Sequence, residues 1–289
     1  MLWSFGKKLK IAVLSGKGGT GKTFVSVNLS AAADRSVYVD CDVEEPNGHL
    51  FFRPDPEGRS VVTVPLPQFD QSRCTGCRIC VDFCAFNALA FVGAKPRLFP
   101  DLCHSCGGCL SLCPHGAVTE VPHVVGEVRK GRSGNVTVLS GFMKTGTVSG
   151  TPVIRELYHQ VAKEVDDLVV LDCPPGSACL VMESIRDADV CVLVAESTVF
   201  GAHNLVMVRE LVEKFGKPFG VVLNKCDGKV NPSENICVRD RLPVLARIPF
   251  DADLGSLNSD GGIAVRELPD YRDRFAAILE AVETVGMNR

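Results

Sequence analysis

The chain has 289 residues, of which 46% are hydrophobic and 22% are charged. This composition excludes a disordered chain, a coiled coil and a collagen-like repeat. Its 31 basic and 34 acidic residues give a net charge of −3, so no overall field attracts nucleic acid or an anionic membrane.

Cysteine is the residue type whose number stands out, with 14 copies. The length predicts one large domain or two smaller ones, which need no disulfides for stability. The first eight residues contain no apolar leader, and no apolar run reaches the roughly 18 residues that span a membrane. We therefore expect a cytoplasmic protein, in which clustered cysteines indicate metal or redox chemistry.

The first predicted element is a buried strand at residues 10–15, followed by G-K-G-G-T-G-K-T at residues 16–23. This matches the phosphate-binding pattern G-x-x-x-x-G-K-[ST], and a helix is predicted at residues 23–33. The glycines let backbone N–H groups turn toward phosphate oxygens, Lys22 should reach the β- and γ-phosphates, and the Thr23 hydroxyl should bind Mg²⁺. The alternative is a glycine-rich turn without a nucleotide. The residues expected to bind the nucleotide in this loop are Gly16, Gly18, Gly19, Thr20, Gly21, Lys22 and Thr23.

A second strand is predicted at residues 36–42, and it ends in two acidic residues, Asp40 and Asp42. Because side chains alternate along a strand, both carboxylates are expected on one face.

Eight of the cysteines lie in two runs of identical spacing, C-x2-C-x2-C-x3-C. That spacing is typical of bacterial [4Fe–4S] ligation, although C-x2-C pairs can also hold zinc. Residues 68–123 resemble a two-cluster ferredoxin, an α+β module in which the last cysteine of each run completes the other cluster. One departure is that Ala85, rather than proline, follows Cys84. The resemblance assigns the first cluster to Cys74, Cys77, Cys80 and Cys113, and the second to Cys103, Cys106, Cys109 and Cys84.

Further buried strands are predicted at residues 167–172, 190–194 and 218–224, with helices at residues 153–164, 180–186, 202–215 and 272–285. Each strand delivers a polar residue at its carboxyl end, where ligands bind in open α/β sheets. The fold class predicted is α/β, a mostly parallel P-loop sheet with helices on both faces, interrupted by the ferredoxin segment. The domain boundaries predicted are 1–67 and 124–289 for the two parts of the P-loop domain, and 68–123 for the insertion.

The motifs together resemble the MinD/Mrp superfamily of P-loop ATPases, which includes the nitrogenase iron protein group. Lys17 resembles the early lysine of its deviant Walker A loop, which reaches the partner's nucleotide across a dimer. The resemblance implies that Asp42 positions the attacking water and that Asp40 lies near Mg²⁺. It also implies that Asp172, in D-C-P-P-G at residues 172–176, holds Mg²⁺ through water.

The same resemblance extends to later positions. It implies that Gly176 donates to the γ-phosphate, that Asn224 reads the base and that the loop containing Pro249 stacks on adenine. Residues 224–227 also spell N-K-x-D, the guanine reader of GTPases, so GTP is an alternative to the favoured ATP. The catalytic residues implied are Lys17, Lys22, Asp42 and Asp172.

Six cysteines lie outside the two runs, and five of them are predicted to be small core residues. Cys179 follows Asp172 at a distance similar to that of a cluster ligand in the nitrogenase iron protein. No second cysteine is found in residues 137–151 to complete such a site. A third, dimer-bridging cluster at Cys179 therefore stays an alternative to a buried cysteine without a metal.

The sequence thus predicts a Mg²⁺-dependent ATPase with two [4Fe–4S] clusters, in which nucleotide state controls electron transfer or cluster delivery. We expect a homodimer or a heterodimer with a related ATPase, a redox or iron–sulfur protein partner, and neither nucleic acid nor membrane. One alternative is an adaptor that docks a redox partner without turnover. Another is a MinD/ParA-like positioning ATPase, which would need lipid or DNA binding.

Overall fold

The structure is a computed structural model that describes residues 8–228 and 231–287. Residues 1–7, 229–230 and 288–289 lie outside the description, so the expectation about the first eight residues falls almost entirely outside the described residues. Within the two described ranges, none of the helices has the length and apolarity needed to cross a bilayer.

A nine-stranded sheet forms the centre of the molecule, in the order β11-β10-β9-β1-β8-β2-β7-β6-β3. The strands from β11 to β7 are all parallel, whereas β6 and β3 are added antiparallel at one edge. The strands are β1 (Leu9–Leu14), β2 (Ser36–Asp40), β3 (Asp55–Phe69), β4 (Leu89–Val92), β5 (Lys95–Leu98), β6 (Val118–Ser133), β7 (Val136–Met143), β8 (Leu168–Asp172), β9 (Val190–Glu196), β10 (Phe219–Cys226) and β11 (Val244–Pro249).

Helices cover both faces of the parallel sheet, because successive side chains of its buried strands enter two different cores. Ala12 and Leu14 pack with α5, α6 and α7 in one core, while Ile11 and Val13 pack with α1 and α11 in the other. The helices are α1 (Lys22–Ala32), α2 (Gly48–Phe52), α3 (Ile79–Phe83), η1 (Pro100–Leu102), α4 (Gly108–Ser111), α5 (Thr151–Val161), α6 (Cys179–Ile185), α7 (Val199–Lys214), α8 (Pro232–Arg239), α9 (Ala252–Ser259), α10 (Ala264–Glu267) and α11 (Pro269–Met287). This is the α/β P-loop architecture, with a mostly parallel sheet, that the sequence predicts.

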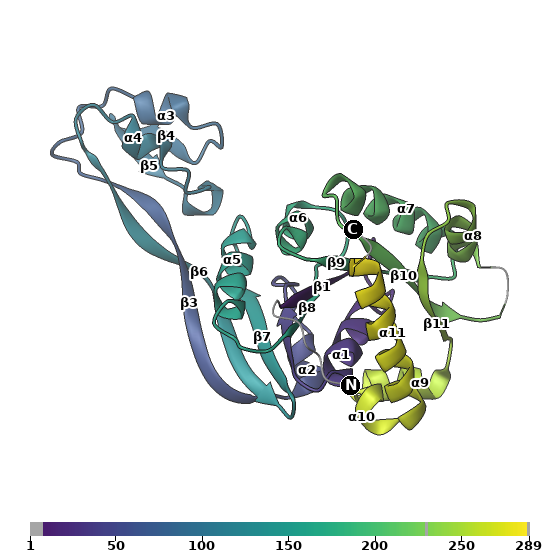
Figure 1. The fold of residues 1–289 in the computed structure, drawn as a ribbon. Coiled ribbons are helices and arrows are strands. Elements are labelled where there is room, and N and C mark those ends of the chain that lie inside the picture. Colours follow the sequence, from purple (N-terminus) through teal and green to yellow (C-terminus); the bar gives the residue numbers. More distant parts are fainter. Residues whose placement is uncertain (1–7, 229–230, 288–289) are drawn as a thin grey trace.

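The cysteine-rich segment lies at the end of a two-stranded arm (Figure 1). Strands β3 and β6 pair continuously from Asp55↔Arg132 to Phe69↔Val118. Beyond that end, the chain forms the β4–β5 hairpin and the short helices α3, η1 and α4. We call residues 70–117 the cysteine module. The arm carries this module beyond the edge of the parallel sheet, where residues 103–105 share a cavity with residues 144–149 and with Pro152 in the first turn of α5.

The ends of several predicted elements differ from the observed ones. The strand predicted at residues 36–42 ends at Asp40, and the chain then turns through residues 41–47 into α2. The sequence analysis did not predict β7, nor the arm strands β3 and β6. The two segment boundaries drawn near residues 68 and 123 lie inside the arm, which runs through both.

Candidate functional site

A pocket of about 400 Å³ opens at the carboxyl ends of the parallel strands. Its wall combines the glycine-rich loop after β1 with the loops that follow β2, β8, β10 and β11. The predicted site residues in this wall are Lys17, Gly18, Gly19, Thr20, Gly21, Lys22, Thr23, Asp42, Asn224 and Pro249. Gly16, Asp40, Asp172 and Gly176 are absent from the wall. The pocket therefore joins segments from five parts of the chain, as an open α/β sheet does at its ligand site.

The glycine-rich loop needs glycine at positions where its backbone is left-handed. Gly19 has φ = 80° and Gly21 has φ = 91°, angles that residues with a Cβ rarely adopt. A Cβ on Gly21 would also lie 2.2 Å from Nδ2 of Asn224. Asn224 Nδ2 donates to the Thr20 carbonyl at 2.8 Å, and Lys225 Nζ donates to the Gly19 carbonyl at 2.7 Å. These two hydrogen bonds hold the glycine-rich loop against the end of β10. Asn224 therefore has a structural contact besides the expected contact with a base.

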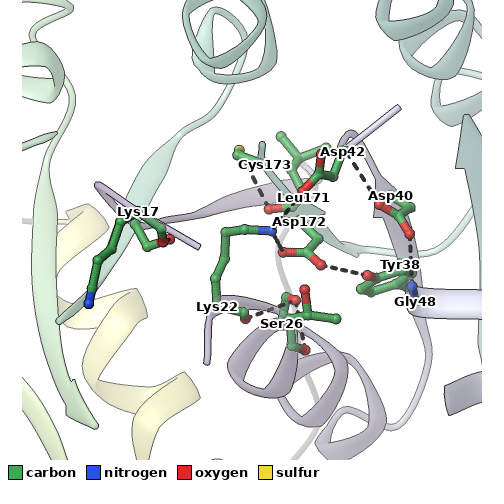
Figure 2. A network of polar contacts seen from close by, with 12 residues as sticks. Lys17, Lys22, Ser26, Tyr38, Asp40, Asp42, Gly48, Leu171, Asp172 and Cys173 are labelled. Carbon is green, nitrogen blue, oxygen red and sulfur yellow. Dashed lines mark hydrogen bonds and ion pairs between the residues drawn. The ribbon is translucent and has the colours of Figure 1, made fainter. Parts of the chain in front are cut away.

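Lys22 points to the end of β8 (Figure 2). Its Nζ donates to Asp172 Oδ1 at 2.6 Å and lies 3.9 Å from Asp42 Oδ2. The second Asp172 oxygen, Oδ2, accepts from the Tyr38 hydroxyl at 2.8 Å. All of Lys22, Tyr38 and Asp172 are buried. Burial acts to lower the pKa of Lys22, but the charge and hydrogen bond of Asp172 outweigh it and the pKa is raised.

Asp40 is the last residue of β2, and Asp42 lies on the turn that follows, so the two are not neighbours on one strand face. Asp40 Oδ2 accepts from the Gly48 N–H at 2.8 Å, and its Oδ1 accepts from the Asp42 N–H at 3.3 Å. The expectation of a shared strand face is wrong, because the strand ends at Asp40 and the backbone of Asp42 folds back over it. Burial, and then the charge of Asp172, raise the pKa of Asp40 to about 8. The pKa of Asp42 is raised to about 6, with burial as the largest cause.

The charge of this cluster fits a bound divalent cation. Lys22 Nζ lies 2.6 Å from Asp172 and 3.9 Å from Asp42, the charge of Asp40 also acts on it, and burial disfavours the charged forms of Asp40 and Asp42. Carboxylate and hydroxyl oxygens are the ligands that Mg²⁺ takes beside phosphates. Thr23, the first-turn residue of α1, faces the same pocket. A magnesium ion held by these groups would neutralise charge on a phosphoryl group.

The two other predicted phosphate contacts have partners within the chain. Lys17 Nζ pairs with Glu196 Oε1 at 2.5 Å, and in Figure 2 it points away from Lys22. The Gly176 N–H donates to the Ser15 carbonyl at 2.9 Å. Neither group faces a phosphate position in this arrangement. Both would have to exchange these partners to contact a nucleotide.

Two cavities in the cysteine module separate the cysteines into two sets. The smaller cavity measures about 20 Å³ and the larger about 310 Å³. The smaller one is lined by Cys74, Cys77, Cys80 and Cys113. The larger one is lined by Cys84, Cys103, Cys106 and Cys109, and also by Cys80 of the first set. Each cavity therefore collects three cysteines of one run and the last cysteine of the other.

The backbone of the two runs repeats in the same way as the spacing. Gly76 and Ser105 are left-handed at the same position of each run, with φ = 77° and 53°. Arg78 and Gly107 also occupy equivalent positions of the two runs and are left-handed, with φ = 66° and 72°. Alternating left-handed residues turn backbone N–H groups inward and make concave sites for anions. The two loops are thus built alike, although glycine occupies only one position of each equivalent pair.

The cysteines also have polar neighbours. The Ala117 N–H lies 3.3 Å from Cys113 Sγ, and burial raises the pKa of Cys109 to about 11. Within the described part of the chain, no three His, Cys, Asp or Glu side chains converge as they would around a single metal ion.

Outside the module, Cys41, Cys173, Cys191 and Cys237 are buried in the apolar core, and burial raises the pKa of each thiol. Cys226 is half-buried. Cys179 is exposed at the first residue of α6.

Sequence reasoning missed three contributors to the nucleotide pocket. Tyr38 looked like one more residue of a buried strand, although its hydroxyl is a polar group in an apolar run and a buried hydroxyl needs a partner. Glu196 lies just beyond the strand predicted at residues 190–194, and no role was predicted for it. Lys225 appeared only as part of a possible base-reading motif, yet its ammonium group holds the loop.

Comparison with known proteins agrees with this fold. The profile of the CobQ/CobB/MinD/ParA nucleotide binding domain family matches residues 11–263. An uncharacterized protein of Methanocaldococcus jannaschii is 27% identical over 254 residues, covering 86% of this chain and 87% of that protein. The cell division ATPase MinD of Pyrococcus furiosus superposes with a TM-score of 0.60 at 20% identity, over 96% of this chain and 98% of that one.

A shorter match is more similar in sequence. An iron–sulfur cluster carrier protein of Pyrococcus horikoshii is 54% identical over 44 residues, which is 14% of this chain and 15% of that protein. The profile match spans most of the chain and includes the glycine-rich loop and the acidic strand ends. The chain belongs to the CobQ/CobB/MinD/ParA family of nucleotide-binding domains.

Proposed function

We propose that this chain is an ATP-binding and ATP-hydrolysing iron–sulfur protein that couples its nucleotide state to electron transfer or to cluster delivery. The observation that carries the proposal is the arrangement of the module cysteines. Eight cysteines surround two cavities in the crossed sets of a two-cluster ferredoxin, on the same chain as a nucleotide-binding domain. The iron–sulfur carrier of P. horikoshii, similar over a short stretch, adds a hint in the same direction.

Residues 68–123, which include the cysteine module, are the proposed ferredoxin domain, inserted between the P-loop segments 1–67 and 124–289. Cys74, Cys77, Cys80 and Cys113 hold one [4Fe–4S] cluster. Cys103, Cys106, Cys109 and Cys84 hold the other. When bound, each cluster would carry one electron at a time.

At the nucleotide pocket, the proposal assigns phosphate binding to the glycine-rich loop and to Lys22. Lys22 leaves Asp172 for the phosphates, and Asp172 and Thr23 would hold Mg²⁺, which when bound would offset charge on the transferred phosphoryl group. Asp42 positions the water that attacks in line. Lys17 leaves Glu196 to reach a nucleotide across a dimer, a homodimer or a heterodimer with a related ATPase. Rearrangements of this kind give the site two states that nucleotide can select.

A short set of contacts links this pocket to the module. The Met143 N–H donates to the carbonyl of Val43, the residue after Asp42, at 2.8 Å. A Cβ on Gly150 would lie 2.4 Å from Val43, so both ends of the segment 143–150 abut the same residue.

That segment continues to the second cysteine loop. Residues 144–149 and residues 103–105 line one cavity of about 150 Å³. Movement of Val43 with the nucleotide would therefore reach the surroundings of Cys103. This contact route supports coupling between nucleotide state and the second cluster.

The test is the metal content and turnover of one preparation. Protein purified without oxygen is predicted to contain about eight Fe per chain, four for each cubane, and to hydrolyse ATP only with Mg²⁺. The Lys22→Ala variant should keep its iron and lose turnover, because Lys22 lies outside the module. Zinc in place of iron, or four Fe per chain, would refute the two-cluster assignment. Turnover that survives in Lys22→Ala would refute the assigned nucleotide site.

A further inference from the structure

The side chain of Tyr38 has contacts that the proposed ATPase chemistry does not yet use. It is completely buried, and its hydroxyl donates to Asp172 Oδ2 at 2.8 Å (Figure 2). Tyr38 lies on β2, next to β8, which carries Asp172. The register pairs Tyr38 with Val170 and Asp40 with Asp172, so the phenol reaches diagonally along the neighbouring strand to the carboxylate at its end.

The two partners of Asp172 differ in how firmly they are fixed. Oδ1 is held by Lys22, whose flexible side chain must turn to the phosphates when a nucleotide binds. Oδ2 is held by Tyr38, whose ring is fixed in its place. A Cβ on Gly48 would lie 2.2 Å from that ring, and the Phe52 ring centre lies 5.0 Å from it. Tyr38 is thus the partner that stays with Asp172.

The contacts of Tyr38 extend to the other buried acid. Gly48, which packs against the Tyr38 ring, is also the residue whose N–H donates to Asp40 Oδ2 at 2.8 Å. One aromatic ring therefore sets the distance between α2 and the end of β8. The carboxylates of Asp40 and Asp172 are oriented through that ring.

We infer that Tyr38 is a positioning residue for the magnesium site: its hydroxyl keeps Asp172 Oδ2 occupied and so directs Oδ1 to the metal when Lys22 leaves. The inference rests on the proposed ATPase function and adds to it the residue that orients the metal ligand. Groups that hydrogen-bond to a metal ligand affect metal affinity about 10- to 100-fold when they are removed.

The Tyr38→Phe variant tests this, because it keeps the ring against Gly48 and Phe52 and removes only the hydroxyl. The readout is the Mg²⁺ concentration at half-maximal binding of a fluorescent ADP analogue, which needs no turnover. We expect this midpoint to rise about 10-fold or more, while analogue binding in EDTA stays at the wild-type level. Tyr158→Phe is the matched control, since it removes a hydroxyl that bonds to the Ser184 carbonyl on α6 and should leave the Mg²⁺ midpoint unchanged.

A double-mutant cycle makes the test specific to Asp172. If Tyr38 acts through that carboxylate, Tyr38→Phe should not shift the Mg²⁺ midpoint further in the Asp172→Asn background. An unchanged midpoint in Tyr38→Phe, or an equal shift in Tyr158→Phe, would overturn the inference and leave the proposed function standing. If nucleotide binding by the wild-type protein does not depend on Mg²⁺, that result would instead refute the proposed function, and the inference with it.

Discussion

The buried carboxyl of Asp40 predicts an unusual pH dependence of stability in the metal-free and nucleotide-free protein. Its pKa is about 8 in the folded protein, against 3.8 for an aspartate carboxyl in water. A carboxyl whose pKa is higher when folded binds protons better in the native state, so stability is greatest at low pH and falls as pH rises between the two values. The cause is burial beside Asp172, with one N–H from Gly48 as partial compensation.

The magnitude follows from the slope for one proton, about 1.4 kcal/mol for each pH unit. Between pH 5 and pH 7, which lie inside the window, Asp40 should remove about 3 kcal/mol of unfolding free energy. For a chain of this size that corresponds to a fall of about 5 °C in Tm. Asp42 adds to the same trend below its pKa of about 6.

The assay is thermal unfolding of wild type and Asp40→Asn at pH 5 and pH 7, without oxygen and with the clusters left in place. Asparagine still accepts from the Gly48 N–H but carries no charge, so we expect Asp40→Asn to be the more stable protein at pH 7 and to lose most of the pH slope. Asp273→Asn, an exposed carboxyl on α11, is the control and should keep the wild-type slope. The reasoning fails if Asp40→Asn retains the full slope.

Three further predictions concern the two sites. Cys84→Ala and Cys113→Ala should each lower the iron content from about eight to about four per chain. Electron paramagnetic resonance should show that the two variants lose different clusters. Loss of the same cluster in both variants would contradict the crossed ligand sets. Gly21→Ala should weaken ATP binding about 10-fold or more without changing iron content, because the left-handed backbone strains alanine by about 1–3 kcal/mol and its Cβ would meet Asn224 at 2.2 Å; wild-type affinity in equilibrium binding would refute the steric argument. Asp42→Asn should bind ATP normally and hydrolyse it about 100-fold or more slowly, and unchanged activity toward a redox partner in this variant would favour the adaptor function.

Much of the fold could be predicted because short, continuous stretches of sequence determine many of its elements. The parallel strands are short apolar runs with polar residues at their carboxyl ends, and the glycine-rich loop carries its own spacing. The arm strands could not be predicted in this way. They contain Pro56, Pro65, Pro67 and Pro122, residues that normally argue against a strand, and their pairing joins segments about 50 to 80 positions apart.

The sequence analysis named most of the residues of the site but not the contacts between them. The resemblance to a two-cluster ferredoxin assigned the cysteines to two crossed sets, and the same cysteines line the two cavities of the module. The contacts of Tyr38 with Asp172 and of Lys17 with Glu196 depend on neighbouring strands and loops that are distant in sequence. The turn at Asp42 differed from expectation because the strand ended two residues early, which no local pattern signalled.

The central claim is that nucleotide state and the clusters communicate. The most direct measurement is a redox titration of both clusters, followed by electron paramagnetic resonance, with no nucleotide, with Mg-ADP and with Mg-ATP. We predict that the midpoint potential of the cluster held by Cys103, Cys106, Cys109 and Cys84 differs between the nucleotide states, because residues 144–149 connect its surroundings to Val43. Two fully loaded clusters whose potentials are the same in all three conditions would contradict the account.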